Sequence, residues 1–526
     1  MIYASKSKLF DPRVARRLAA VARALLLLVL LASILATGMM KPVSRDEHMY
    51  CTAAVLLARG QLIYRDFAYP AQLPCHTLLL GALYRIFHTD HYLLVGRLLS
   101  AFCDMAVVVL ILAIYRRAFE SHPPVGRWLG LAAAVLYVFN PLVDYAAGYA
   151  WNHDVVIACV VLSFWVFART GFRPAPPFWR IAAMGALLTF ATCMRVTTVL
   201  VAVVFLGAVL AAAGGSIYNR IRTALPFAVA GLLVLACPLW IVMRAPKAAW
   251  LNLVEIPALY GRWLHELGLV FNKAELTIDC LKTPGYQALL VVTIYLMAVA
   301  VRRRASLCDA SRRNLLLAGG VVVCFCLIAF LPPTMWHQYW AVPVPFLVIA
   351  CAYPMAALRH AAQKPDGKRS LRIACTVTFS CATLAILTNL TVLRRLPAIV
   401  VPEYWTPVML HRTAVDIAGR VGEPKLVLTL GPLYALEGGS DIYPELASGS
   451  IVYRAADAMS AEDRAITQTV GPAGLEDLLS KKPPSAAILG VEPSYLSFLE
   501  EPLLQALDPA WPRHSREDGL QVYVRP

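Results

Sequence analysis

The chain has 526 residues, of which 59% are hydrophobic and 15% are charged, and its mean hydropathy is +0.63. Soluble domains carry about 25% charged residues, so this composition excludes an ordinary soluble enzyme. The net charge of +16 hides a division, because residues 396–526 carry 10 Lys+Arg and 17 Asp+Glu while residues 1–395 carry a net charge of +23. The basic part is also the apolar part, which indicates loop topology in a membrane rather than binding to nucleic acid.

Long apolar runs recur through residues 1–395. A helix needs about 20 apolar residues to cross the hydrocarbon core, and the first such run follows the basic stretch Lys6–Arg17. No convincing cleavage site follows this run, so we interpret it as an uncleaved signal-anchor helix. The sequence predicts about eleven transmembrane helices, near 19–39, 93–115, 128–146, 154–169, 181–195, 197–213, 224–243, 287–301, 315–331, 339–358 and 371–394.

Basic residues predict the orientation of these helices. The N-terminal segment and every second loop carry about 23 Lys and Arg in roughly 80 residues, whereas the opposite loops carry about 10 in roughly 100. Cytoplasmic segments carry such an excess, so we expect the N-terminus in the cytoplasm and the C-terminal end outside. The predicted cytoplasmic segments are 1–18, 115–127, 169–180, 214–223, 302–314 and 359–372, and the two long outer loops are 40–92 and 244–286.

The last part of the chain has a different pattern. Strand-like runs at 425–430, 486–489 and 520–524 alternate with helical ones, which predicts a small α/β domain. The predicted fold class is an all-α polytopic membrane protein over residues 1–395, with this α/β domain, residues 396–526, on the outer side. In the first outer loop, the short apolar stretch 78–87 predicts an interfacial helix rather than a span.

The acidic residues of the membrane part mark candidate chemistry. Asp104 follows Arg97 by seven residues on one helix face, and this spacing predicts a structural pair, because a lone charge in lipid is costly. The densest acidic cluster, Asp46 and Glu47, follows the first helix. One of these carboxylates can act as a general base, or the two can share a cation. The alternative is helix capping, with Ser44 as the N-cap and both acids at the positive end of a helix.

Three further sites are candidates for binding. The turn at 60–70 contains an aromatic residue and an Arg-Asp pair (Tyr64, Arg65, Asp66). The alternative explanation is a loop without a binding role, which its aromatic residues anchor at the membrane interface. Arg195 lies between two helices, where it is either a functional cation or a side chain that snorkels to the interface. His337 and Tyr339 lie among aromatic residues, for which an interfacial belt is the alternative explanation.

The stretch from Asp46 to Pro70 resembles the first outer loop of GT-C-fold glycosyltransferases, in particular the bacterial protein O-mannosyltransferase-like and aminoarabinose-transferase-like families, and motifs further along the chain resemble other parts of these families more loosely. The features that carry the resemblance are Asp46-Glu47, the Ala-rich helix that ends at Gly60, Tyr64-Arg65-Asp66-Phe67-x-Tyr69-Pro70, Arg97, Asn152-His153-Asp154 and His337-Gln338-Tyr339. The resemblance in topology covers most of residues 10–395.

The resemblance implies a polyprenyl-phosphate sugar as donor and inversion by a single displacement. It implies that Asp46 is the base or acceptor-binding group, with Glu47 beside it and Asp154 as a second acidic residue. The leaving phosphate gains negative charge and needs a cation, for which Arg195 and His337 are the candidates. A divalent cation near Asp46 and Asp154 is an option, although no ligand spacing in the sequence demands one.

The expected partners are thus a lipid-linked sugar donor, membrane lipids and a lipid, glycan or protein acceptor, at the outer face of a bacterial inner membrane. The main alternative is a polytopic transporter or lipid flippase, which would place ionisable residues near the midplane and often show repeated halves. A polymerase or ligase for diphosphate-linked glycans is a third alternative, which predicts a large late outer loop rich in Arg and His.

Overall fold

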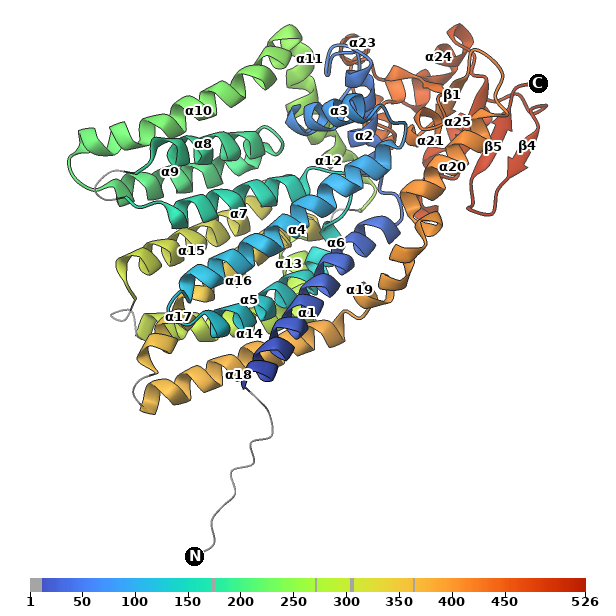
Figure 1. The fold of residues 1–526 in the computed structure, drawn as a ribbon. Coiled ribbons are helices and arrows are strands. Elements are labelled where there is room, and N and C mark those ends of the chain that lie inside the picture. Colours follow the sequence, from blue (N-terminus) through green and yellow to red (C-terminus); the bar gives the residue numbers. More distant parts are fainter. Residues whose placement is uncertain (1–11, 173–175, 270–271, 303–306, 363–364) are drawn as a thin grey trace, which may run out of the picture.

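The computed structural model describes residues 12–172, 176–269, 272–302, 307–362 and 365–526 (Figure 1). Some basic residues of the predicted cytoplasmic segments lie outside the described residues, namely Lys6, Lys8, Arg173, Arg303, Arg304 and Lys364.

All eleven segments predicted to span the membrane are largely helical. Within the described residues, eight helices are long and apolar enough to cross a membrane, so the chain is a multi-pass membrane protein. The remaining three predicted spans are shorter helices of 16, 17 and 15 residues, and the count of eleven spans stays a prediction. The helices of this part are α1 Pro12–Met40, α4 Tyr92–Ala118, α5 Pro123–Val138, α6 Pro141–Ala146, α7 His153–Arg169, α8 Phe178–Thr192, α9 Val199–Ala213, α10 Ile217–Arg244, α14 Pro284–Arg302, α15 Asp309–Ala329, α16 Val344–Ala350, α17 Ala352–Ala361, α18 Pro365–Thr388 and α19 Thr391–Arg394.

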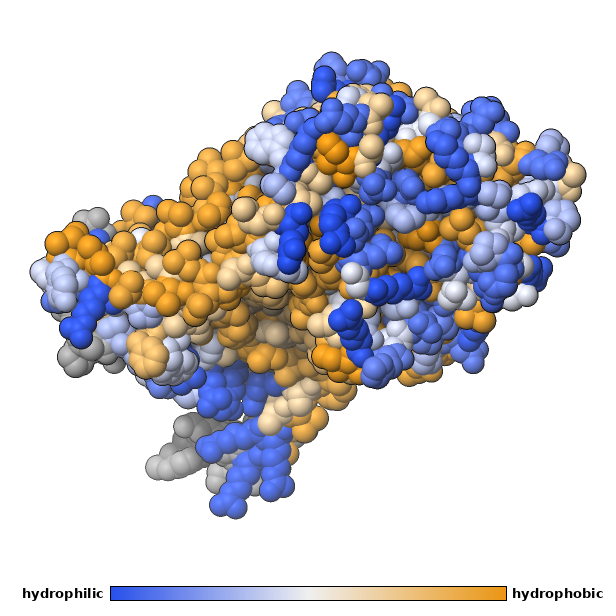
Figure 2. Space-filling model, turned by 90° about the horizontal axis from the view of Figure 1, so that it is seen from above, coloured by the Kyte–Doolittle hydropathy of each residue, from blue (hydrophilic) through white to orange (hydrophobic). Residues whose placement is uncertain are grey.

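The long helices lie side by side, and the short helices α2 (Arg45–Ala58), α3 (Cys75–Phe87), α11 (Pro246–Trp250) and α12 (Ile256–Glu266) gather with the C-terminal strands at one end of them (Figure 1). Among the closest helix pairs are α8 with α10, α4 with α7, and α14 with α18. Figure 2 shows the consequence, with hydrophobic residues covering the helical part and hydrophilic residues gathered over the other side of the view. An apolar surface of this kind is stable only in contact with lipid.

Residues 40–92 form the first long loop, and two helices fill most of it. Helix α2 runs over Arg45–Ala58 and helix α3 over Cys75–Phe87. The latter contains the predicted short helix at 78–87, and its interfacial position stays a prediction. Between α2 and α3 the chain turns at Tyr64, which has a φ of +69°.

Residues 244–286 form the second long loop, which contains α11 Pro246–Trp250, a π-helical turn at Leu251–Glu255, α12 Ile256–Glu266 and α13 Lys273–Lys282. Asn252, in the π-helical turn, joins the two long loops. Its Oδ1 accepts a hydrogen bond from the Tyr69 N–H at 2.7 Å, and its backbone oxygen accepts one from the Ala71 N–H at 2.9 Å. These bonds satisfy backbone donors that the turn leaves free.

The C-terminal region, residues 406–526, contains a five-stranded sheet with the order β2-β1-β3-β5-β4. The first three strands are parallel, and β5 runs antiparallel to both β3 and β4. Three strands confirm the strand-like runs of the sequence, whereas the short strands β2 and β4 were not predicted. The elements are β1 Leu426–Thr429, β2 Asp441–Ile442, β3 Ala486–Leu489, β4 Arg513–Ser515, β5 Gln521–Val524, α20 Thr406–Ala418, α21 Leu433–Leu436, α22 Ser450–Ala456, α23 Ala461–Thr467, α24 Leu475–Lys481 and α25 Glu501–Gln505.

Candidate active site

The two adjacent acids at the start of α2 have different environments. Glu47 is wholly buried and forms a bidentate ion pair with Arg97 of α4, with Nε–Oε1 and Nη2–Oε2 distances of 2.8 Å. The Ser44 and Ala150 N–H groups also donate to its carboxylate, at 2.8 and 2.7 Å. Ser44 is the N-cap residue of α2. The capping interpretation therefore describes Glu47, whose oxygens are both taken up by structural contacts.

Arg97 is equally saturated, because its remaining N–H groups donate to backbone oxygens near the end of α1, at Gly38, Lys41 and Pro42. The predicted pairing of Arg97 with Asp104 is wrong. Seven residues are about two helical turns, so Arg97 and Asp104 stand roughly 10.5 Å apart along α4. Glu47 is the nearer acidic partner of Arg97. Asp104 instead accepts a hydrogen bond from Tyr137 of α5.

Asp46 is largely buried, and among the described residues its carboxylate has no hydrogen-bond or ion-pair partner. Burial raises the pKa of Asp46 above its usual value, and the positive charges of Arg45 and Arg454 act against this rise. A carboxylate with a raised pKa and no structural partner is the kind of group that accepts a proton during catalysis.

Three tyrosines lie near Asp46. Burial raises the pKa of Tyr50 of α2, Tyr260 of α12 and Tyr339 in the His337–Trp340 turn, and the negative charge of Asp46 adds to this rise. The positive charge of Arg195 acts against this rise in the pKa of Tyr50 and Tyr339. Asp46 and Arg195 therefore lie near the same two tyrosines, Tyr50 and Tyr339, so the structure brings together Asp46, Arg195 and Tyr339, which the sequence proposed separately.

Arg195 is available for an anionic ligand. It lies just after α8 and is only partly exposed. The one hydrogen bond of its guanidinium among the described residues is a long one, 3.4 Å from Nη2 to Asn152 Oδ1. Asn152 is itself fixed by bonds to Gln72 Oε1 and the Met194 oxygen, at 2.9 and 2.8 Å. Most guanidinium donors of Arg195 are thus free to bind a phosphate.

The C-terminal region contributes cations and polar groups to the same place. Arg454 of α22 is buried, donates to the Ser450 oxygen at 2.7 Å, and lies 5.0 Å from the ring centroid of Tyr260. Arg45, which directly precedes Asp46, contacts Glu492 at 3.5 Å and donates to the Tyr495 hydroxyl at 3.0 Å. Arg454, Glu492 and Tyr495 were missed in the sequence, because none of them stands in a motif and only the fold joins positions so far apart.

Asp154, at the start of α7, is buried and lies apart from Asp46. Its Oδ2 accepts a hydrogen bond from the Gly148 N–H at 2.8 Å, and its Oδ1 has no hydrogen-bond partner. The nearby cation is Lys41, which donates to backbone oxygens including that of Ala147 at 2.6 Å. No contact between Asp154 and Asp46 exists among the described residues, so the catalytic role of Asp154 stays a prediction.

The turn with Tyr64, Arg65 and Asp66 is held together by its own contacts. The buried Tyr64 hydroxyl donates to the Gln72 oxygen at 2.5 Å. Arg65 and Asp66 form an ion pair at 2.7 Å, which lowers the pKa of Asp66. This geometry explains how the turn keeps its shape, and a contact of these residues with substrate stays a prediction.

His337 lies at the same end of the molecule, with its ring centroid 5.6 Å from that of Tyr145. Its proposed contact with the donor phosphate stays a prediction. Asp46 and Asp154 do not belong to a group of metal ligands in the part of the chain that the structure describes. The group of that kind found there is formed by His91, His411 and Glu437.

The arrangement of the helices and the C-terminal region is the GT-C fold. The chain is similar to ArnT from Cupriavidus metallidurans bound to undecaprenyl phosphate, with a TM-score of 0.58 at 14% identity over 98% of each chain. The structure of the same protein in the apo state matches with a TM-score of 0.59 at 14% identity, over 97% of this chain and 98% of that chain. The oligosaccharyltransferase of Archaeoglobus fulgidus tethered with an acceptor peptide matches with a TM-score of 0.49 at 10% identity, over 96% of this chain and 74% of that chain. No family model matches the sequence, and no curated protein matches it.

Proposed function

We propose that this protein is a glycosyltransferase that moves a sugar from a polyprenyl-phosphate carrier to an envelope acceptor, with inversion. The observation that carries the proposal is Asp46, a carboxylate without a structural partner beside free arginine donors, at the loop-rich end of a GT-C fold. The ArnT structure that this chain resembles holds undecaprenyl phosphate. A carrier of that chemistry supplies the phosphate that the cations of this site would bind.

In the proposed reaction, Asp46 accepts the proton of an acceptor hydroxyl or amine. The acceptor atom forms a bond to the anomeric carbon while the bond from that carbon to the phosphate oxygen breaks. The electron pair of the broken bond leaves with the polyprenyl phosphate, whose growing charge Arg195 stabilises. One displacement inverts the anomeric configuration. Glu47 and Arg97 act as positioning residues, because they fix the first turn of α2.

We also propose the topology of the chain. The N-terminus would lie in the cytoplasm of a bacterium, the membrane would be the inner one, and about eleven helices in residues 1–395 would place residues 396–526 outside. The asymmetry of basic residues in the loops supports this orientation. A reporter enzyme fused after residue 526, active only outside the cytoplasm, tests it, and a signal only from a cytoplasmic reporter would contradict it.

Radiolabelled transfer tests the activity. Purified protein in nanodiscs would be given a panel of synthetic polyprenyl-phosphate sugars and an extract of envelope acceptors. We expect transfer from one donor, and a loss of roughly 10²-fold or more in Asp46→Asn. Asp279→Asn, which removes an exposed carboxylate of the second long loop, is the matched control and should keep full activity.

Two outcomes would contradict the proposal in different ways. Transfer that is undiminished in Asp46→Asn would retain the enzyme and remove the assigned base. No transfer from any donor by folded protein would favour a transporter or lipid flippase. The anomeric configuration of the product, read by NMR, checks inversion separately.

A further inference from the structure

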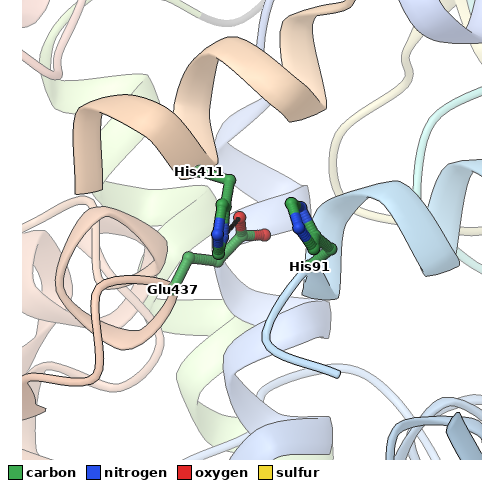
Figure 3. A group of neighbouring side chains, drawn as sticks. All are labelled: His91, His411 and Glu437. Atoms are coloured by element: carbon green, nitrogen blue, oxygen red, sulfur yellow. Dashed lines mark ion pairs between the residues drawn. The ribbon is translucent and has the colours of Figure 1, made fainter. Parts of the chain in front are cut away.

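Three side chains from distant parts of the sequence meet away from Asp46 (Figure 3). His91 immediately precedes α4, His411 lies on α20, and Glu437 directly follows α21. The first belongs to the membrane part of the chain and the other two to the C-terminal region. The cluster therefore lies where these two parts touch.

The three side chains are close enough to bind one ion. One ligand atom of each lies within 4.8 Å of the other two. The imidazole centroids of His91 and His411 are 3.6 Å apart, and His411 Nδ1 lies 3.3 Å from Glu437 Oε2. Tetrahedral zinc with bonds of about 2.0–2.2 Å separates its ligand atoms by about 3.3 Å. A small contraction of the cluster would thus complete the geometry.

The facing atoms lack hydrogen bonds. His91 Nδ1, His411 Nδ1 and Glu437 Oε2 are all buried without a hydrogen-bond partner, and Glu437 is only 1% exposed. Buried polar atoms are nearly always hydrogen-bonded, and a buried carboxylate is costly without a partner. Three such atoms at one place indicate a shared ligand that accepts lone pairs, which is the property of a metal ion.

The surroundings hold the cluster in an orientation suited to binding. The Leu93 N–H donates to Glu437 Oε1 at 2.7 Å, which leaves Oε2 directed at the imidazoles. An outer hydrogen bond that orients a ligand in this way is typical of metal sites.

An ion pair between His411 and Glu437 alone is a weaker explanation. It leaves the Nδ1 of His91 without a partner, and it does not account for a second imidazole held with its ring centroid 3.6 Å from that of His411. We propose that His91, His411 and Glu437 bind a divalent cation of the zinc class, which links the C-terminal region to the start of α4. Two imidazoles and one carboxylate favour zinc over magnesium or calcium, and water can take a fourth position.

Metal uptake by the full chain tests this proposal without reference to glycosyl transfer. The protein would be purified without a histidine tag, freed of metal with EDTA in nanodiscs and titrated with zinc chloride. We expect the wild type to retain one more zinc ion per chain than His91→Asn, His411→Asn or Glu437→Gln. His122→Asn should match the wild type, because His122 packs against His360 in another histidine pair. Asp46→Asn should also match it, which separates this site from the proposed catalytic one.

Cobalt chloride gives a second readout that does not depend on the folding of a variant. Cobalt in a tetrahedral site of two nitrogens and one oxygen gives visible d–d bands without thiolate charge transfer. We expect these bands in the wild type, and zinc should displace them. Equal zinc uptake by the wild type and all three variants, a spectrum of thiolate ligands or the absence of d–d bands would overturn the proposal.

Discussion

Arg97 and Glu47 form a bidentate ion pair with neither side chain exposed, which joins α4 to the first turn of α2. Arg97 also binds backbone oxygens at the end of α1. One guanidinium therefore fixes the relation of three helices. Asp46 precedes Glu47 directly, so this pair determines where the proposed base stands.

Breaking this pair should destabilise the protein. Glu47→Gln or Arg97→Leu leaves a buried charge without its partner, which costs about 3–5 kcal/mol. Chemical denaturation of the protein in detergent micelles would measure the loss. Asp46→Asn is the matched control, since its carboxylate has no partner among the described residues, and its stability should stay within about 1 kcal/mol of the wild type. Equal stability of all three variants would show that the pair is not structural.

The pH dependence of transfer should report Asp46. A general base works only when it is ionised, and burial raises the pKa of Asp46 above the ordinary value of an aspartate. We therefore expect kcat/KM to rise with pH through this raised pKa and then to level off. The residual rate of Asp46→Asn should lack this acidic limb. A limb unchanged in that variant would assign it to another group.

The arginines beside Asp46 should set the position of that limb. Arg45 and Arg454 both lower the pKa of Asp46, so neutralising either removes an attraction for the ionised form. In Arg45→Gln and Arg454→Gln we expect the limb to move to higher pH. Arg59→Gln, which breaks an exposed pair with Asp441, should leave the pH profile unchanged. A shift to lower pH in either test variant would contradict the assignment.

Arg195 should act on the donor. A charge-assisted hydrogen bond contributes about 1.5–3 kcal/mol, so its loss in Arg195→Gln should lower kcat/KM for a polyprenyl-phosphate sugar by roughly ten- to hundredfold. Arg262→Gln is the control, because it removes an exposed arginine on α12 of the second long loop. Kinetics at varied donor concentration would measure the effect. If both variants lost activity equally, the phosphate contact would have to be assigned elsewhere.

The join between the two long loops can be tested at Asn252. Asn252→Ala removes the acceptor of the Tyr69 N–H and leaves a buried donor unpaired, which costs about 1–3 kcal/mol. Limited proteolysis should then cut the second long loop faster than in the wild type. Asn272→Ala, which removes an exposed helix cap on the same loop, controls for a general loosening. Unchanged cleavage in Asn252→Ala would show that the join is not needed.

The long helices and three strands could be predicted because their patterns are local. Apolar length and alternation are properties of single segments, and each predicted span is helical in the structure. The strands β2 and β4 were missed because two or three residues carry too little pattern. The functions of adjacent acids could not be separated either. Asp46 and Glu47 stand side by side in sequence, but α2 turns one toward Arg97 and leaves the other without a partner.

Pairings across long separations were the part that sequence could not supply. The predicted pair of Arg97 and Asp104 followed from helix periodicity, whereas the actual partner of Arg97 lies in another helix. Arg454 and His411 acquire their significance only from the packing of the C-terminal region against the first long loop. One sequence has no local signal for such a contact.

The composite surroundings of Asp46 have a consequence for how the protein is made. Asp46 is synthesised early, whereas Arg454 and Tyr495 follow only after about 400 further residues. Until then Asp46 has Arg45 beside it but lacks Arg454, the second cation that lowers its pKa. The surroundings of the proposed base are therefore complete only when the C-terminal region has folded onto the first long loop, and we expect activity to begin at that point.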